Sequence, residues 1–336
     1  MKAVVYEGPR RLEVKDVPVP QPGPGEALLK VFYGGLCGTD MHIYHGVHPR
    51  AKPPLIMGHE FCGQIVALNG EAAGVKVGDK VVVEPLLSCG KCAACLSGYY
   101  HVCANLGLLG IDRDGGFAEY ALVPISRVHR LPQDMPMLEA ALVEPVAVAI
   151  HAVRMSRLKI GDIVAILGAG PIGTLVAETC RASGAEVIIT EVAPERLERA
   201  RARGFLALNA LAQDVEAEVR AVTCGKGVDV VFDAAGVPAT AELSTRIVKV
   251  RGQVVVVGVF NEPPPVDYRT VSFRELDIIG VRVYNFEDYQ IAADMIYKRK
   301  IKVDGIVTHI FKLEEAERAC EIMERGEGMK ILFRLD

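Results

Sequence analysis

The chain has 336 residues, half of them hydrophobic, and a formal net charge of −4 at pH 7. Because single hydrophobic cores stop growing at about 250–300 residues, this length predicts two domains. Acidic and basic residues are interspersed and form no basic stripe, which excludes a typical nucleic-acid-binding protein. The most apolar segment, residues 163–177, contains three glycines and a proline and is shorter than the ~20 residues of a membrane-spanning helix.

The cysteine content indicates a cellular compartment. There are nine cysteines, and residues 1–6 run into a charged turn rather than into a secretory signal peptide. In a chain without an export signal, cysteines favour metal or thiol chemistry over disulfides. We therefore expect a cytoplasmic protein.

Short apolar runs separated by proline and glycine predict a β-rich first part, up to about residue 145. Residues 17–25 carry four prolines and are predicted to form a loop. Many short strands with such turns favour a barrel or a sandwich. The predicted strands are residues 3–6, 12–17, 27–33, 63–68, 80–83 and 117–123.

From residue 161 the pattern changes to strands that alternate with helices, which predicts βαβ units and a parallel sheet. The predicted strands of this part are residues 163–167, 187–190, 228–232, 254–257 and 278–281. After about residue 284, a helix (286–297), a strand (306–311), a helix (313–325) and a strand (329–334) follow. Composition alone does not assign these last elements to a domain.

Three motifs far apart in the sequence carry possible metal ligands. Cys37 lies in Gly-Leu-Cys-Gly-Thr-Asp, His59 and Glu60 are adjacent in Gly-His-Glu, and Glu144 precedes a proline. Thiolate, imidazole and carboxylate form a mixed ligand set that suits zinc. Three protein ligands with one open position are typical of a catalytic zinc rather than a structural one.

A second cluster consists of Cys89, Cys92, Cys95 and Cys103. Four thiolates on a short lobe, residues 85–105, can close a tetrahedron around zinc and predict a structural site. Three cysteines at intervals of three also fit an iron–sulfur cluster, which stays open as an alternative. Four other cysteines are predicted to be small core residues: Cys62, Cys180, Cys224 and Cys320. We expect three histidines in surface loops: His45, His48 and His101.

The segment Gly168-Ala169-Gly170-Pro171-Ile172-Gly173 follows a predicted strand and begins a predicted helix. In this context the glycines permit a tight turn and close approach of a pyrophosphate to the helix start. Glu191 ends the next predicted strand, where a carboxylate binds the ribose diol and repels a 2′-phosphate by about 4 kcal/mol at ~4 Å. NAD is therefore preferred to NADP, although Arg196 is long enough to fold back toward such a phosphate.

Several motifs occur together, in order: Cys37-Gly-Thr-Asp, Gly58-His-Glu, the cysteine lobe, Gly115-Gly-Phe-Ala-Glu-Tyr, Glu144-Pro145, the Gly168 turn and Val307-Thr-His309. This series resembles the zinc-dependent medium-chain dehydrogenases, in the branch of polyol (sorbitol), butanediol, threonine and sugar-acid dehydrogenases. The resemblance implies a GroES-like, β-rich catalytic domain (1–146 and 286–336) with an inserted NAD-binding Rossmann domain (147–285). It also implies an active site in the cleft between them, and a homodimer or homotetramer that pairs through the edge strand at 278–283.

The resemblance also implies roles for single residues. Cys37, His59 and Glu60 correspond to catalytic zinc ligands, and Glu144 to a carboxylate that approaches or joins the zinc. Thr39 and His42 correspond to a proton relay. Two zinc ions per chain are expected, one catalytic and one structural. The cofactor-binding positions are Gly168, Gly170, Pro171, Ile172, Gly173, Glu191, Arg196, Val257, Gly258, Val259, Val281 and Arg282.

The expected reaction is hydride transfer from a secondary alcohol to NAD, giving a ketone, with a polyol, a vicinal diol or a sugar acid as substrate. L-Threonine is disfavoured, because Leu86 stands where threonine dehydrogenases carry a histidine. Sorbitol-type enzymes have a tyrosine directly after the relay histidine, whereas this chain has Ile43. A zinc-free quinone reductase and a non-catalytic NAD-binding regulator are the alternatives from other classes, and two zinc ions per chain would argue against both.

Overall fold

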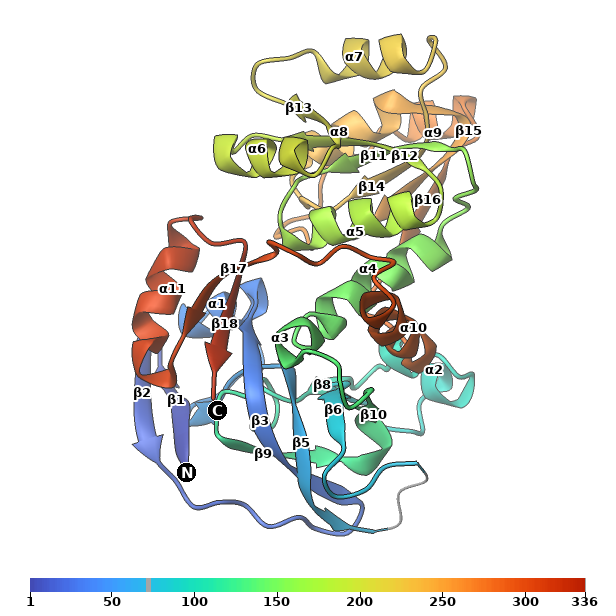
Figure 1. Ribbon diagram of the computed structural model, residues 1–336. Helices are drawn as coiled ribbons and strands as arrows, with labels where there is room; N and C mark the ends of the chain where they lie inside the picture. Colours follow the sequence, from blue (N-terminus) through green and yellow to red (C-terminus); the bar gives the residue numbers. More distant parts are fainter. Residues whose placement is uncertain (71–73, 336) are drawn as a thin grey trace. The chain divides into compact units, whose positions relative to one another are not determined.

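The computed structural model describes residues 1–70 and 74–335. The chain divides into two compact units (Figure 1). Unit 1 takes the chain up to Glu144 and then returns with Asn285–Arg299 and with the chain from Val303 onward. Unit 2 contains Pro145–Tyr284 and Lys300–Lys302. Both ends of the chain therefore contribute to the same unit.

Unit 1 is built mainly from antiparallel strands. Its largest sheet has the order β10-β6-β5-β3-β18-β17, with β9 also paired to β3. A second sheet has the order β2-β1-β4, and β7 pairs with β8. The strands are β1 (Lys2–Gly8), β2 (Arg11–Asp16), β3 (Glu26–Leu36), β4 (Leu55–Ile56), β5 (Glu60–Asn69), β6 (Lys80–Val83), β7 (Leu86–Leu87), β8 (Gly107–Leu108), β9 (Tyr120–Pro124), β10 (Val128–Arg130), β17 (Val307–Phe311) and β18 (Lys330–Arg334).

Apolar side chains that alternate along these strands form the hydrophobic cores of unit 1. Leu29 and Val31 of β3 pack with Phe61 and Ile65 of β5 and with Val81 of β6 in one buried cluster, since residues two apart share a face. Helices and 3-10 turns connect the strands. They are α1 (Gly38–Tyr44), α2 (Ala93–Leu96), η1 (Tyr100–Val102), η2 (Ile125–Arg127), α3 (Met137–Ala140), α10 (Phe286–Tyr297), η3 (Leu313–Glu315) and α11 (Ala316–Glu324).

Unit 2 contains a six-stranded parallel sheet of order β13-β12-β11-β14-β15-β16. Its central strand, β11, is almost continuously apolar because helices cover both faces of the sheet (Figure 1). The strands are β11 (Ile163–Leu167), β12 (Glu186–Glu191), β13 (Leu206–Asn209), β14 (Val228–Asp233), β15 (Val248–Val256) and β16 (Asp277–Gly280). The helices are α5 (Pro171–Ala182), α6 (Pro194–Ala202), α7 (Val215–Val222), α8 (Pro238–Ile247) and α9 (Tyr268–Phe273), and α4 (Val143–Met155) begins at the end of unit 1.

The predicted fold class, a GroES-like β-rich domain combined with a Rossmann parallel sheet, is confirmed. The helix predicted at 286–297 has the observed bounds of α10. Asn285 is the N-cap of this helix, and its side chain accepts the backbone N–H of Asp288. The sequence pattern missed α1, which is only two turns long and follows Cys37 directly.

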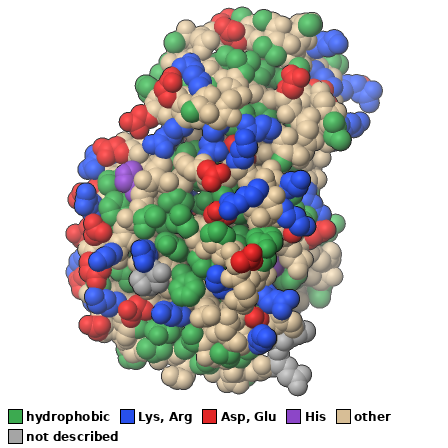
Figure 2. Space-filling view, viewed as in Figure 1, with side chains coloured by type: hydrophobic (Ala, Val, Ile, Leu, Met, Phe, Trp, Pro, Cys, Tyr) green, Lys and Arg blue, Asp and Glu red, His purple; other side chains and the backbone are tan. Residues whose placement is uncertain are grey.

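None of the described helices is long and apolar enough to cross a membrane. On the face that Figure 2 shows, acidic and basic side chains are mixed on each unit.

Two predictions about single residues were wrong. Cys224 is exposed, because it lies in the turn after α7 with a positive φ of 51°, where its side chain points away from the core. The apolar residues before it, Ala221 and Val222, end the helix, so Cys224 does not share the buried face of α7. His101 is buried, because η1 packs its ring against Tyr99 and Tyr100. The buried positions predicted for Cys62, Cys180 and Cys320 are confirmed.

Candidate active site

Cys37, His59 and Glu60 come together in unit 1. Each offers one ligand atom, and the three atoms lie within 4.8 Å of one another. Cys37 stands between the end of β3 and the start of α1, whereas His59 directly precedes β5 and Glu60 is the first residue of that strand. The neighbouring strands β3 and β5 pair antiparallel, with Gly35 opposite Glu60. The end of β3 and the start of β5 therefore lie side by side.

Asp40 supports this cluster, and the sequence reasoning gave it no role. Its carboxylate is fully buried, and Oδ2 accepts the N–H of Cys37 at 2.9 Å. Oδ1 lies 3.5 Å from Nδ1 of His59. Among the described residues, neither Asp40 Oδ1 nor His59 Nδ1 has a hydrogen-bond partner, which leaves each atom facing the other. The imidazole is therefore oriented by Nδ1 and has Nε2 left for a metal, as in carboxylate–histidine–metal arrangements.

Lys330 on β18 is a second residue that the sequence reasoning missed. Its ammonium lies 2.5 Å from Oε2 of Glu60, and both side chains are buried. Burial by itself lowers the pKa of Lys330, but Glu60 and Cys37 outweigh burial and raise it. Lys330 therefore stays charged beside the ligand cluster.

Glu144 lies close to this cluster but outside the group of three converging ligand atoms. It is the second residue of α4, it is buried, and its charge contributes to raising the pKa of Lys330. A direct bond from Glu144 to a metal stays a prediction. Thr39 and His42 lie on α1, three residues apart and thus on one side of the helix, with His42 exposed.

The donor set fits zinc. Sulfur, imidazole nitrogen and carboxylate oxygen are the three ligand types that zinc takes in proteins, and three protein ligands leave a position for a substrate. The buried Asp40 oxygen that lies 3.5 Å from Nδ1 of His59 is placed as the outer-sphere partner that such a histidine needs.

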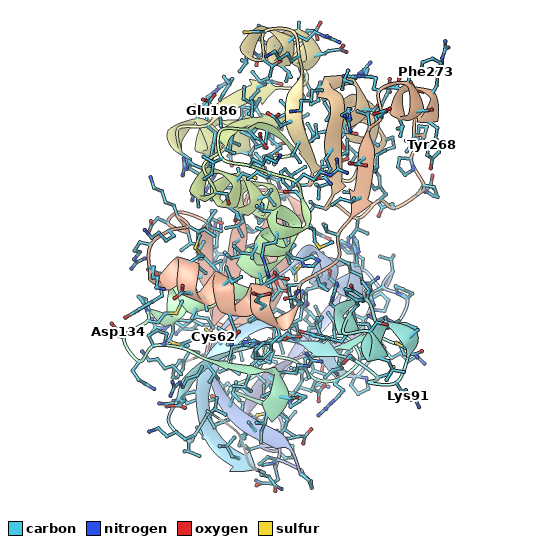
Figure 3. The ribbon with its side chains drawn as sticks, turned by 90° about the vertical axis from the view of Figure 1, so that its right-hand side faces the viewer. Cys62, Lys91, Asp134, Glu186, Tyr268 and Phe273 are labelled. Carbon is cyan, nitrogen blue, oxygen red and sulfur yellow. The ribbon has the colours of Figure 1, made fainter. Side chains whose placement is uncertain are left out.

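The four lobe cysteines form the second group of converging ligands, again within 4.8 Å of one another. Sγ of Cys92 lies 3.5 Å from that of Cys95 and 3.8 Å from that of Cys103. Backbone N–H groups of Cys95 and Ala104 lower the pKa of Cys92 to about 6, which favours the thiolate that a metal requires. Lys91 lies in this lobe (Figure 3). With four thiolates and no open position, this site can bind a structural metal.

A buried polar cluster anchors the lobe. No sequence motif indicated this cluster. Arg127 donates to Glu84 at 2.7 Å and to Ser88 at 2.9 Å, and its guanidinium lies over the ring of Tyr100 at 4.2 Å. Glu84 is fully buried, so this ion pair joins η2 to the end of β6 and to the lobe. Because the partners are more than twenty residues apart, local spacing could not reveal them.

The predicted phosphate turn lies between β11 and α5 in unit 2. Gly168 has a φ of +100°, which favours glycine. A Cβ at Gly173 would lie 1.9 Å from the carbonyl oxygen of Gly168, so the helix start packs directly against the turn. A Cβ at Gly170 would meet nothing nearer than Arg196 Nη1, at 3.8 Å. Gly170 therefore leaves open space in front of the helix start, whose first residues are Pro171 and Ile172.

Glu191 ends β12 beside this turn. Its Oε2 accepts the N–H of Ala169 at 2.9 Å, and its Oε1 accepts those of Val192 and Ala193 at 2.7 and 3.0 Å. These bonds fix the carboxylate at the carboxyl edge of the sheet, the edge where dinucleotides bind in such folds. Arg196 on α6 is half-buried next to Gly170.

The remaining predicted cofactor residues follow neighbouring strands at the same edge. Val257 and Gly258, after β15, donate to the carbonyl oxygen of Asp233 at 2.9 and 2.8 Å. Val259 is exposed. Val281, after β16, donates to Val256 at 3.1 Å, and Arg282 is exposed. Unit 2 thus collects all the predicted cofactor positions at one end of its parallel strands.

Comparisons with known proteins agree with this geometry. Residues 23–133 match the model of the alcohol dehydrogenase GroES-like domain, and residues 171–298 match that of zinc-binding dehydrogenases. A 2-dehydro-3-deoxy-L-galactonate 5-dehydrogenase of Pseudoalteromonas atlantica is 39% identical, over 99% of this chain and 98% of that protein. An L-threonine 3-dehydrogenase of Pyrococcus horikoshii is 38% identical, over 96% of this chain and 95% of that protein.

Solved structures resemble the whole chain. A protein of Sinorhizobium meliloti, described as a zinc-binding dehydrogenase and bound to NADP, superimposes with a TM-score of 0.93 at 36% identity, covering 99% of this chain and 98% of that one. The fold and the two ligand clusters define a zinc-dependent oxidoreductase. The chain belongs to the zinc-binding dehydrogenases with a GroES-like domain, which confirms the resemblance. It is an enzyme of the kind that oxidises an alcohol to a ketone with a nicotinamide cofactor.

Proposed function

We propose that this enzyme oxidises a secondary hydroxyl group of a polyhydroxylated small molecule, with NAD as hydride acceptor and with zinc held by Cys37, His59 and Glu60. The observation that supports this most is the convergence of thiolate, imidazole and carboxylate within 4.8 Å. Zinc bound there would polarise the substrate hydroxyl and lower its pKa, which eases loss of its proton.

The residues of α1 have the chemistry to move that proton. The Thr39 hydroxyl can both accept and donate a proton, and His42, one turn further along, is exposed and can exchange it with water. We assign Thr39 to the substrate end of this relay and His42 to the solvent end. Asp40 of the same helix instead faces the interior, where it orients His59.

Glu191 supports NAD rather than NADP. Three backbone N–H groups hold its carboxylate in place, so it cannot easily move aside for a 2′-phosphate. The repulsion between the two anions would be about 4 kcal/mol at ~4 Å. Two observations favour NADP instead. The guanidinium of Arg196 lies beside Gly170, where it can pair with a 2′-phosphate, and the relative from Sinorhizobium meliloti binds NADP. We expect kcat/KM to be higher with NAD, and a higher value with NADP would overturn this assignment.

The substrate class rests on the relatives and on one buried residue. Similar proteins are named for sugar acids and for sorbitol, and a structural neighbour for 2R,3R-butanediol. Leu86, which stands where threonine dehydrogenases carry a histidine, is fully buried on β7 and offers no polar side-chain atom, which disfavours L-threonine as substrate. Since L-threonine dehydrogenases are also among the relatives, L-threonine remains the second candidate.

A screen of NAD⁺ reduction tests this proposal. Zinc-loaded enzyme is assayed with vicinal diols, pentitols, hexitols, aldonates and L-threonine, and NADH is recorded by absorbance. Reduction should occur with a polyhydroxylated secondary alcohol, and chelator-treated enzyme should lose it. Strong activity with L-threonine alone would favour the second candidate. A wild-type protein that carries zinc but oxidises none of these compounds would contradict the proposal.

We also propose that two copies pair through unit 2. β16 is the edge strand of its sheet, and Ile278 on this strand is partly exposed. Two large apolar side chains of the adjoining α9, Tyr268 and Phe273, are 75% and 80% exposed (Figure 3). Exposed edge strands pair readily with another chain. Light scattering should give a dimer or tetramer, and a monomer would remove this proposal.

A further inference from the structure

Lys330 and Glu60 meet across an intervening strand. β3 lies between β5, which carries Glu60, and β18, which carries Lys330 (Figure 1). Gly35 of β3 pairs with Glu60 on one side and with Leu332 on the other. The ammonium reaches over β3, donates to Oε2 of Glu60 at 2.5 Å and lies 3.3 Å from the carbonyl oxygen of Leu36.

Gly35 makes this contact possible. A Cβ at this position would lie 2.4 Å from Oε2 of Glu60 and 3.2 Å from its Cβ. The Glu60 side chain therefore occupies the space that a side chain at position 35 would fill. Their burial is nearly complete, with 4% of the Lys330 side chain and 2% of the Glu60 side chain exposed. A buried ion pair in such close contact fixes both groups, because separating them leaves a charge without compensation.

The contact also gives the two oxygens of the Glu60 carboxylate different roles. Oε2 of Glu60 is committed to Lys330, whereas the carboxylate as a whole belongs to the ligand cluster with Cys37 and His59. A carboxylate bound through both oxygens would fill an additional position around a metal. Catalysis by a zinc ion requires that one position stay open for substrate.

We propose that Lys330 is a positioning residue that keeps Glu60 from binding the zinc ion through both oxygens and thereby preserves the open position. This inference rests on the proposed function, since it assumes zinc at Cys37, His59 and Glu60. A second consequence follows from charge. The ammonium offsets the negative charge of the ligand set, so the metal is bound less tightly and stays a stronger Lewis acid than with an uncompensated carboxylate.

The test is Lys330→Met, which keeps most of the side-chain volume but removes the charge and the donor. We expect zinc at the catalytic site to bind about tenfold more tightly in competition with a chelator, an effect of the size that outer-sphere partners have. X-ray absorption at the zinc edge should show increased oxygen coordination, averaged over the two zinc ions of the chain. Lys330→Arg, which can still donate to Oε2, should behave as wild type. If Lys330→Met does not fold, Lys330→Gln replaces it with the same expected direction.

The control is Lys80→Met, which removes a lysine from β6 of the same sheet, where the ammonium donates to the carbonyl oxygen of Met135 at 3.3 Å. It should leave zinc affinity unchanged. Unchanged or weaker zinc binding in Lys330→Met, or an unchanged number of ligands, would overturn the inference while wild-type alcohol oxidation still stands. Wild-type protein without zinc at Cys37 would instead contradict the proposed function itself.

Discussion

Asp40 holds two of the proposed zinc ligands at once: its Oδ2 accepts the N–H of Cys37 at 2.9 Å, and its Oδ1 lies 3.5 Å from Nδ1 of His59. Both oxygens of one fully buried carboxylate thus contact the backbone of Cys37 and the imidazole of His59, which are more than twenty residues apart in sequence. The ligand cluster depends on this residue although it contributes no ligand atom.

Asp40→Asn should therefore weaken zinc binding. The amide has one oxygen, so it can keep the bond to Cys37 or the contact with His59 but not both. We expect a loss of about 10–100-fold in zinc affinity, measured by competition with a chelator. Asp294→Asn on α10, where the carboxylate pairs with Lys298 at the surface, is the control and should change nothing. An unaltered affinity in Asp40→Asn would show that the contact is incidental.

Cys37→Ser should abolish turnover and leave the fold intact. Cys37 is half-buried between β3 and α1, and serine fills nearly the same space but is a poor zinc ligand at neutral pH. The metal content should fall by one zinc per chain, because the lobe cysteines form a separate cluster. Circular dichroism checks the fold and metal analysis the stoichiometry. A variant that lacks this zinc and remains active would refute the mechanism.

The proton on His59 predicts how zinc binding depends on pH. Burial lowers the pKa of His59, but Asp40 and Cys37 outweigh it and raise this pKa well above the usual 6.5. A raised folded-state pKa adds stability that is present below about 6.5 and is lost as pH rises through the raised value. Zinc must displace this proton, so its affinity should increase over the same interval.

Titration of zinc affinity at several pH values, together with melting curves of chelator-treated protein, measures both effects. The melting temperature of the metal-free protein should fall as the pH rises through this interval. Asp40→Asn removes one of the two negative groups and should shift both curves to lower pH. Zinc affinity that is constant from pH 6 upward in the wild type would exclude a raised pKa of His59.

Cys103→Ser should remove the other zinc ion and destabilise the lobe. Cys103 is buried, and its sulfur accepts the N–H groups of Cys89 and Asn105, both at 3.3 Å. The lobe has little apolar contact of its own, with Leu96 and Tyr99 largely exposed, so it depends on the metal. We expect a lower melting temperature and faster proteolysis within 88–105. Cys224→Ser, at an exposed cysteine outside both clusters, should match the wild type.

Two glycines of the phosphate turn should respond differently to alanine. In Gly173→Ala the new methyl group would lie 1.9 Å from the carbonyl oxygen of Gly168, so unit 2 should lose stability. In Gly170→Ala the nearest atom is Arg196 Nη1, at 3.8 Å, so the fold should be unaffected. The methyl group would instead occupy the space of the pyrophosphate, and the Kd for NADH should increase about tenfold or more. Fluorescence titration and melting curves separate the two effects, and equal NADH affinity in Gly170→Ala would argue against a dinucleotide at this turn.

The sequence by itself determined the two groups of metal ligands and the phosphate turn. Each depends on residues that are close in sequence or on motifs with characteristic spacing, as in the lobe cysteines and Gly168 to Gly173. Apolar runs and turn residues also located most strands, because strand patterns are local. These features needed no knowledge of which strands are neighbours.

Only the tertiary structure decided which charges support the ligands. Lys330 and Glu60 are 270 residues apart and meet because β5, β3 and β18 are consecutive in one sheet. Their contact further requires the missing side chain of Gly35, and no local pattern encodes that combination. The same holds for Arg127 beneath the lobe and for the exposed thiol of Cys224, since burial and ion pairing depend on how distant segments pack.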